Sequence, residues 1–390
     1  MNRWLTPEKS LPADGTGAEL VGRAWVPRFE GPALVRVREG EVYDLSPVAA
    51  TSSQLLNLED PVRAIRESDR LTHLGPVADL LLNSAARDPG KPWLLAPCDL
   101  QAIKASGVTF VASLLERVIE EQARGDAGKA EGLRTSITAV IGHNLQAVKP
   151  GSADARRLKD VLIAQGVWSQ YLEVGIGPDA EIFSKAQPMS AVGTGADVGI
   201  HPGSEWNNPE PEIVLAVNQR GGVVGATLGN DVNLRDFEGR SALLLGKAKD
   251  NNASAAIGPF IRLFDEHFGL DDVRQCDVAL TIEGPEGFAF TATSSMSQIS
   301  RDPLEIVEHT IGRYHQYPDG LMLFLGTMFA PTVDRVAPGK GFTHVVGDIV
   351  SVSTPRLGAL VNRVNHCDDI APWDFGAGAL MRNLARRGLI

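Results

Sequence analysis

The chain has 390 residues, of which 43% are hydrophobic and 22% are charged. This is an ordinary globular composition, long enough for a large buried core. Lysine and arginine total 37 against 48 acidic residues, a net charge of −11, so the basic footprint of a nucleic-acid-binding protein is missing. No apolar run approaches the roughly 18 residues of a membrane span, and residues 1–17 lack the apolar stretch of a signal peptide. Three widely spaced cysteines favour a reduced, cytoplasmic protein and argue against a thiolate zinc site.

The first 90 residues differ from the rest of the chain in their pattern of apolar, polar and turn-forming residues. We predict a small N-terminal α+β domain over residues 1–90 and a larger catalytic domain over residues 91–390. Residues 24–47 alternate apolar and polar side chains around a turn at Arg38–Glu41, which predicts a β-hairpin. The turn-rich segment 87–92 marks the expected boundary between the two domains.

Helical periodicity follows this boundary. Residues 106–124 carry apolar side chains at helical spacing, and the glutamates at positions 116, 120 and 121 fall on the polar side. We predict further helices over residues 133–146 and 154–165.

From residue 173 onward the sequence is typical of short strands separated by Gly, Pro and Asn. The candidate strands are residues 173–178, 212–217, 223–229, 277–284, 288–294, 321–326, 348–355 and 359–366. Strands at this spacing, without regular helices between them, predict a strand-rich α+β fold built on an antiparallel or mixed β-sandwich or roll. A doubly wound parallel sheet is disfavoured.

The clearest chemical signal is a pair of glutamates, Glu210 and Glu212. In an extended segment residues i and i+2 face the same side, where two carboxylates repel unless a cation lies between them. A hairpin turn centred on Arg220–Gly221 places Asp231 opposite Glu210, whereas a turn centred on Gly221–Gly222 places Asp231 opposite Glu212. Either register brings a third carboxylate within about 5 Å.

Three oxygen ligands without His or Cys suit a hard divalent cation, Mg²⁺ first, with Mn²⁺ or Ca²⁺ as substitutes. The alternative is a solvated acidic hairpin with no metal. Downstream, Lys249 is by default a surface lysine. Beside a carbonyl substrate on a cation, however, a lysine of lowered pKa can accept a proton. Arg235 is a candidate to hold the carboxylates or the substrate.

These residues resemble the fumarylacetoacetate hydrolase superfamily. The resemblance rests on the run E-P-E, the segment N-D-V-N-L-R-D and the lysine upstream of a Gly-Pro pair. It extends over roughly residues 95–380, with the further motifs F-L-G-T, G-D-I-V and L-G-A-L-V-N. It implies a β-sandwich roll that forms a homodimer or homotetramer. It also implies that Glu210, Glu212 and Asp231 bind Mg²⁺ and that Arg235 and Lys249 belong to the active site.

One segment distinguishes branches of this superfamily. Its C–C hydrolases carry N-Y-x-x-H-x-x-E, whose His–Glu pair activates water. Here the corresponding residues 109–116 read T-F-V-A-S-L-L-E, so Ser113 stands at the His position and only Glu116 remains, and hydrolysis loses its usual base. The strings GVTFVASLLERVIEE, WSQYLEVGIGPDAEIF, WNNPEPE and KAKDNNASAAIGPF resemble the sugar-acid dehydratase branch. That resemblance implies Mg²⁺-dependent dehydration of a 2-keto-3-deoxy-pentonate, of the D-xylonate or D-arabinonate type, to 2,5-dioxopentanoate in oxidative pentose degradation.

Within this hypothesis Lys249 removes the C3 proton of the sugar acid. Glu116, directly or through Ser113 or water, protonates the departing C4 hydroxyl. Three further residues are candidate substrate contacts, each with a purely structural alternative: Lys185, Ser190 and Thr327.

Two other functions stay open. One is a hydrolase of a 2,4-diketo acid that uses the same metal site, and the other is a non-catalytic sugar-acid or metal-binding protein. A nicotinamide enzyme is disfavoured because the glycines between Gly193 and Gly199 lack the spacing of a dinucleotide-binding loop.

Overall fold

A computed structural model of the chain describes residues 1–138, 145 and 148–390. Its largest feature is an eleven-stranded sheet with the order β4-β3-β2-β1-β13-β11-β10-β16-β6-β7, in which β5 also pairs with β1. Its strands are β1 (Leu20–Val26), β2 (Gly31–Arg38), β3 (Glu41–Asp44), β4 (Thr72–Pro76), β5 (Trp93–Leu95), β6 (Ala102–Ser106), β7 (Ile182–Ala186), β10 (Pro211–Val217), β11 (Val223–Asp231), β13 (Ala255–Leu263) and β16 (Leu321–Phe324).

A five-stranded sheet packs against the large one, with the order β15-β14-β17-β18-β8. Its strands are β8 (Asp197–Ile200), β14 (Asp277–Glu283), β15 (Ala289–Ser295), β17 (Ile349–Thr354) and β18 (Gly358–His366). A third, two-stranded sheet joins β9 (Asn207–Asn208) to β12 (Asn233–Leu234). Among the described strands, only the β16·β6 and β18·β8 pairs are parallel. The strand-rich α+β prediction is therefore confirmed.

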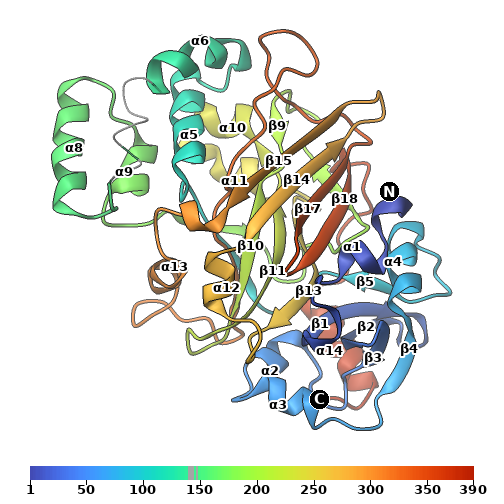
Figure 1. The fold of residues 1–390 in the computed structure, drawn as a ribbon. Coiled ribbons are helices and arrows are strands. Elements are labelled where there is room, and N and C mark those ends of the chain that lie inside the picture. The colour runs from blue at the N-terminus through green and yellow to red at the C-terminus, as the bar shows by residue number, and fades with distance from the viewer. Residues whose placement is uncertain (139–144, 146–147) are drawn as a thin grey trace.

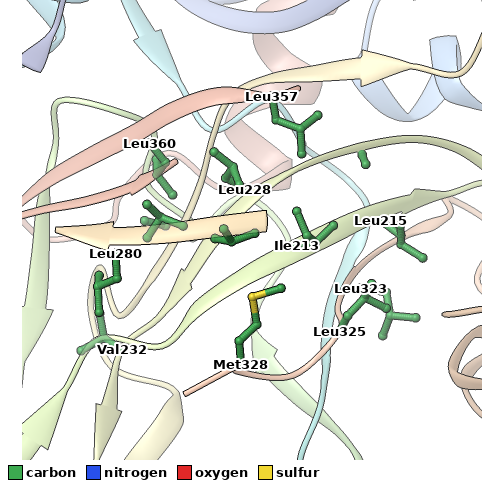
Figure 2. Packing of buried hydrophobic residues seen from close by; sticks show 14 of the residues in the cluster. Ile213, Leu215, Leu228, Val232, Leu280, Leu323, Leu325, Met328, Leu357 and Leu360 are labelled. Carbon is green, nitrogen blue, oxygen red and sulfur yellow. The ribbon is translucent and has the colours of Figure 1, made fainter. Parts of the chain in front are cut away.

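The main hydrophobic core fills the space between the two larger sheets. Ile213 and Leu215 of β10 and Leu228 of β11 face Leu280 of β14 and Leu360 of β18 (Figure 2). A second core covers the other face of β10 and β11. Because both faces of these central strands are buried, every polar side chain on them must find a partner inside the protein.

The helices lie mostly around the ends and edges of the sheets. Figure 1 shows α6, α8 and α9 at one end of the molecule and β1–β4 with α14 at the other. The helices are α1 (Pro7–Ser10), α2 (Ser52–Leu56), α3 (Pro61–Arg66), α4 (Val77–Ala86), α5 (Val111–Ala123), α6 (Ala127–Ile137), α8 (Ala153–Ala164), α9 (Gln170–Ile176), α10 (Arg235–Arg240), α11 (Leu245–Lys249), α12 (Leu270–Arg274), α13 (Pro303–Thr310) and α14 (Ala377–Arg386). In the part of the chain that is described, none of them combines the length and apolar character needed to cross a membrane.

Most predicted elements are present. The N-terminal hairpin turns where expected, with Arg38 paired to Glu41, and α5 and α8 fall within or beside their predicted ranges. The predicted helix 133–146 is described only in part: α6 ends at Ile137, and most of the rest lies outside the described residues. The strands before residue 91 join those after it in one sheet, because β1 pairs with β13.

One prediction was wrong. Residues 173–178 were expected to form a strand, but residues 173–176 complete helix α9 and residues 177–178 follow it as a bend. Ser169 caps this helix by accepting a hydrogen bond from the backbone N–H of Tyr171 at 3.1 Å. The buried positions 171, 172, 175 and 176 have helical spacing, and a side chain at Gly175 would collide with Leu114 of α5.

Candidate active site

The site is built on the hairpin of β10 and β11. Pro211 pairs with Asn230 and Glu212 with Gly229, and the backbone N–H of Asp231 donates to the carbonyl of Glu210 at 3.0 Å. This is the register expected for a turn centred on Arg220–Gly221, so the prediction that places Asp231 opposite Glu210 is confirmed.

The register gathers three carboxylates at one point. One carboxylate oxygen of each of Glu210, Glu212 and Asp231 lies within 4.8 Å of the others, and each residue is only 1–2% exposed. The alternative of a solvated acidic hairpin is therefore wrong. Three buried carboxylates would repel strongly, so the arrangement requires cations around them.

Three basic side chains supply part of the positive charge that the carboxylates require. Lys249 donates to Glu210 at 2.5 Å and to Asp231 at 3.2 Å, and Arg117 of α5 donates to the other oxygen of Glu210. Lys185 of β7 donates to the backbone carbonyls of Lys249 and Val232. The structure thus places Lys249 and Lys185 beside the carboxylates, and their catalytic and substrate-binding roles stay predictions.

The carboxylates around Lys249 favour its protonated form. Burial alone would lower its pKa, but the charges of Asp231 and Glu210 outweigh burial and raise it. The lowered pKa expected from the sequence is therefore not found while the carboxylates face the lysine directly. A divalent cation between the carboxylates would take over their charge and favour the neutral amine.

Glu212 has no basic partner among the described residues within salt-bridge distance. Its carboxylate accepts a hydrogen bond from the backbone N–H of Gly326 at 2.7 Å. Burial, together with the charges of Asp231 and Glu210, raises its pKa well above the ordinary value. Asp231 Oδ1 lies 2.9 Å from Lys185 Nζ but without hydrogen-bond geometry. Oxygen donors that are buried, convergent and incompletely partnered fit a hard divalent cation.

A chain of ion pairs leads outward from Glu210. Arg117 also pairs with Glu120 at 2.5 Å, and Glu120 accepts a hydrogen bond from Arg235 at 2.6 Å. Arg235 in turn donates to Glu116 at 2.8 Å and lies over the ring of Trp206. Arg235 is therefore connected to the carboxylate triad through Glu120 and Arg117, and its expected role in holding the substrate stays a prediction.

Glu116 is held as a carboxylate. Arg134 donates to both of its oxygens, at 2.9 and 3.0 Å, and Arg235 adds a third bond. Burial alone would raise the pKa of Glu116, but the two arginines outweigh burial and lower it. A general acid needs the opposite shift, so this geometry speaks against the expected acid role.

Three other candidates make only local contacts in this structure. The hydroxyl of Ser113 donates to the carbonyl of Phe110 at 3.0 Å, and that of Ser190 donates to the carbonyl of Gln187 at 2.8 Å. Thr327 lies after β16 rather than in a strand, and its hydroxyl donates to the carbonyl of Phe329 at 2.9 Å. Their substrate roles stay predictions.

The sequence interpretation missed two buried charges on α5. Glu120 was expected on the polar side of this helix but is 1% exposed, and Arg117 is 6% exposed. With Ser113 they fall at positions i, i+4 and i+7, which lie on one helix face. That spacing was the available signal, because three polar residues on one face can mark a buried polar site.

Glu181, immediately before β7, was also missed. Burial and the charge of Glu238 raise its pKa to about 7, against the opposing charges of Lys249 and Arg117. Its carboxyl group lies against Gly107, where a side chain would collide with it. A carboxyl group with this pKa can deliver or accept a proton near neutral pH.

A family model described as "Fumarylacetoacetate (FAA) hydrolase C-terminal" matches residues 165–365, more than half of the chain. The chain therefore belongs to the fumarylacetoacetate hydrolase family. The matched segment contains the carboxylate triad, Lys185, Lys249 and the whole β10–β11 hairpin.

Two curated relatives have names that specify a reaction and a substrate. A "Probable 2-keto-3-deoxyxylonate dehydratase" of Haloferax volcanii is 29% identical over 194 residues, or 50% of this chain and 63% of the relative. A "2-dehydro-3-deoxy-D-arabinonate dehydratase" of Saccharolobus solfataricus is 30% identical over 184 residues, or 47% of this chain and 58% of the relative. The similarity thus spans less than two thirds of each relative.

A solved structure covers more of the fold. A 2-keto-3-deoxy-D-arabinonate dehydratase, complexed with magnesium and 2,5-dioxopentanoate, superposes with a TM-score of 0.60. The alignment covers 89% of this chain and 99% of that chain at 20% identity. At this identity the likeness establishes a shared fold, which includes the region before the family match.

Proposed function

We propose that the protein is a Mg²⁺-dependent hydro-lyase that converts a 2-keto-3-deoxy-pentonate into 2,5-dioxopentanoate. The observation that carries the proposal is the buried triad of Glu210, Glu212 and Asp231 with the ammonium of Lys249 against it. The names of the two curated relatives support the same substrate class.

The triad would hold the cation. When bound, Mg²⁺ supplies positive charge beside a 2-keto acid's carboxylate and keto oxygens and makes its C3 hydrogens more acidic. The protein's residues then handle the protons. Lys249, in its neutral form, accepts a proton from C3. Lys185 keeps this lysine in place by binding its backbone carbonyl.

The departing hydroxyl at C4 requires a proton donor. Glu181 is the better candidate, because burial raises its pKa to about 7 while ion pairs lower the pKa of Glu116. Loss of the C3 proton and the C4 hydroxyl releases one water and leaves a C3=C4 double bond. Movement of a proton from C5 to C3 shifts that double bond to C4=C5, and the resulting enol becomes the C5 aldehyde. No oxidant or second leaving group is needed.

A hydrolase of 2,4-diketo acids is the competing activity, since it needs the same cation. Such an enzyme must activate water. At the position where family hydrolases carry His, Ser113 is 3% exposed and donates to the carbonyl of Phe110. This contact gives water no base at that position, which favours the dehydratase.

The test is to incubate the Mg²⁺-loaded protein with 2-keto-3-deoxy-D-xylonate and with its D-arabinonate counterpart, and to follow the semialdehyde by NMR. An acylpyruvate is incubated in parallel, with pyruvate release as the readout. The proposal expects semialdehyde, no pyruvate, and loss of turnover in Glu212→Gln. Pyruvate without semialdehyde would establish the hydrolase. Binding of keto acids without any product would establish a non-catalytic binding protein.

A further inference from the structure

The triad occupies one part of a longer polar ladder. Asn208 of β9 pairs with Asn233 of β12, in the same register that pairs Pro211 with Asn230 in β10 and β11. β9 and β12 therefore continue the hairpin beyond Pro209 and Val232. We call a cross-strand pair of side chains on one face a rung. Asn208 and Asn233 form the next rung on the face of Glu210 and Asp231, two residues or about 7 Å along the strands.

The two asparagines belong to the same face as the carboxylates. Val232 and Leu234, on either side of Asn233, both pack into the core between the two large sheets. Because side chains alternate along a strand, Asn233 faces away from that core, together with Asp231. Asn208 is likewise two residues from Glu210.

The amide groups on this rung lack partners. Asn208 and Asn233 are both 0% exposed. Within the described residues, no hydrogen-bond partner is found for the side-chain nitrogen or oxygen of Asn233, or for the Oδ1 atom of Asn208. The Nδ2 atom of Asn208 donates only to the carbonyl of its neighbour Pro209, at 2.9 Å. Buried amides without partners are destabilising, so their presence beside a metal site points to a ligand that completes them.

The opposite end of the ladder is closed. Gly229 faces Glu212 across the hairpin, and a side chain at this position would collide with the ring of Phe324. A 2-keto acid held at the triad by its first two carbons therefore cannot extend its chain past Gly229 on this face, whereas the rung of Asn208 and Asn233 lies in the other direction along the strands.

We propose that Asn208 and Asn233 form the subsite that binds the hydroxyl group at the far end of a five-carbon 2-keto acid. An amide offers both a donor and an acceptor, as a hydroxyl requires. An apolar chain at the same place would leave the two amides unpaired, so the subsite selects hydroxylated chains. This inference rests on the proposed function and specifies how its substrate is distinguished from simpler keto acids.

The test compares two ligands that cannot be dehydrated, since neither has a C4 hydroxyl: 2-oxopentanoate and 5-hydroxy-2-oxopentanoate. Affinities are measured by calorimetry on the Mg²⁺-loaded full chain. We expect the wild type to favour the hydroxylated ligand by roughly tenfold, the value of about one good hydrogen bond. Asn233→Leu and Asn208→Leu should abolish that preference while leaving the affinity for 2-oxopentanoate within about twofold.

Melting temperature is the second readout. Leu is close to Asn in size and leaves no unpaired amide, so neither variant should unfold at a lower temperature. Asn365→Leu, which alters a half-buried amide bonded to Asp197, is the control and should keep the wild-type preference.

Each result separates the two proposals. A wild-type preference that survives in both Leu variants, or no preference in the wild type, would overturn the subsite without touching the dehydratase. Loss of affinity for both ligands with a lower melting temperature would make the asparagines structural and also overturn the subsite. Wild-type protein that binds neither keto acid with Mg²⁺ would overturn the proposed function itself.

Discussion

The Nζ atom of Lys185 lies 2.9 Å from Oδ1 of Asp231, and both side chains are almost completely buried. The same ammonium donates to the backbone carbonyl of Lys249. Burial lowers the pKa of Lys185, and the charge of Asp231 opposes that shift. One lysine therefore balances a carboxylate of the triad and also fixes the chain that carries the second lysine.

The first prediction concerns this pair. Lys185→Met should lower the free energy of unfolding by about 3–5 kcal/mol, because it leaves a buried carboxylate without one of its two cations. Mg²⁺ at 100 times its dissociation constant should restore about 2.7 kcal/mol, since it binds only the folded state. Urea unfolding with and without Mg²⁺ measures both values.

Lys104→Met is the matched control. Lys104 lies on the neighbouring strand β6, is half-buried, and donates to the hydroxyl of Ser184 at 3.0 Å. Its replacement should change the stability by no more than about 0.5 kcal/mol and should not alter the effect of Mg²⁺. Equal losses in the two variants would mean that the Lys185–Asp231 charge pair is not what stabilises the site.

The second prediction concerns pH and the metal. Burial and the neighbouring carboxylates raise the pKa of Glu212, so without a cation they favour the retention of a proton on this group. Binding of Mg²⁺ must release it. The affinity for Mg²⁺ should therefore rise with pH, by about tenfold per unit while Glu212 is protonated, and level off above its pKa.

Calorimetric titration with Mg²⁺ in two buffers of different ionisation enthalpy counts the released protons. Glu212→Gln should lose both the binding and the proton release. Glu283→Gln, which alters a carboxylate paired with Arg3 at the surface, should keep both. An affinity of the wild type for Mg²⁺ that does not change with pH would contradict the prediction.

The third prediction concerns Glu181, whose pKa burial raises to about 7 from an ordinary value of 4.5. A general acid works in its protonated form, so turnover should fall as pH rises through the pKa that Glu181 has in the Mg²⁺-loaded protein. Glu181→Gln should reduce turnover by roughly 10²–10⁴-fold and remove this limb of the profile.

The same shift predicts a change in stability. The folded state binds this proton more tightly than the unfolded state does, so stability should fall as pH rises from about 4.5 to about 7 and then level off. Thermal unfolding across this pH range should show a smaller loss of stability with rising pH in Glu181→Gln than in the wild type. Glu173→Gln, at a carboxylate paired with Lys159, should leave the fall unchanged.

The central hairpin was predictable from the sequence for a physical reason. Side chains alternate along a strand, and a turn fixes which residues lie opposite each other, so the positions of Glu210, Glu212 and Asp231 follow from counting residues. Such arguments need only local geometry. The same rule identifies the rung of Asn208 and Asn233 once the register is known.

The charged residues around the triad were not predictable in this way. Arg117 reaches Glu210 across 93 residues of sequence, and Arg235 reaches Glu120 across 115. Charged side chains on a helix normally face water, and their burial here depends on partners that no local pattern reveals. The strand expected at residues 173–178 failed because its alternation of small and apolar residues also fits the end of a helix capped by Ser169.

The last prediction separates the two proton transfers. If Lys249 takes the C3 proton, Lys249→Met should stop both dehydration and the exchange of C3 hydrogen into heavy water. If Glu181 protonates the departing hydroxyl, Glu181→Gln should lose dehydration but retain C3 exchange, because proton removal at C3 can still occur and reverse. NMR of the sugar acid in heavy water, with each variant saturated in Mg²⁺, observes the two steps independently.

Glu116→Gln completes the set. This variant removes the negative charge that pairs with Arg134 and Arg235. The change reaches the site only through Arg235, Glu120 and Arg117, so we expect C3 exchange and dehydration to slow together. Retained exchange without dehydration in this variant would instead restore Glu116 as the acid, the role expected in the sequence analysis. Exchange that persists in Lys249→Met would remove this lysine from the base role and leave Glu181 as the group that takes the C3 proton.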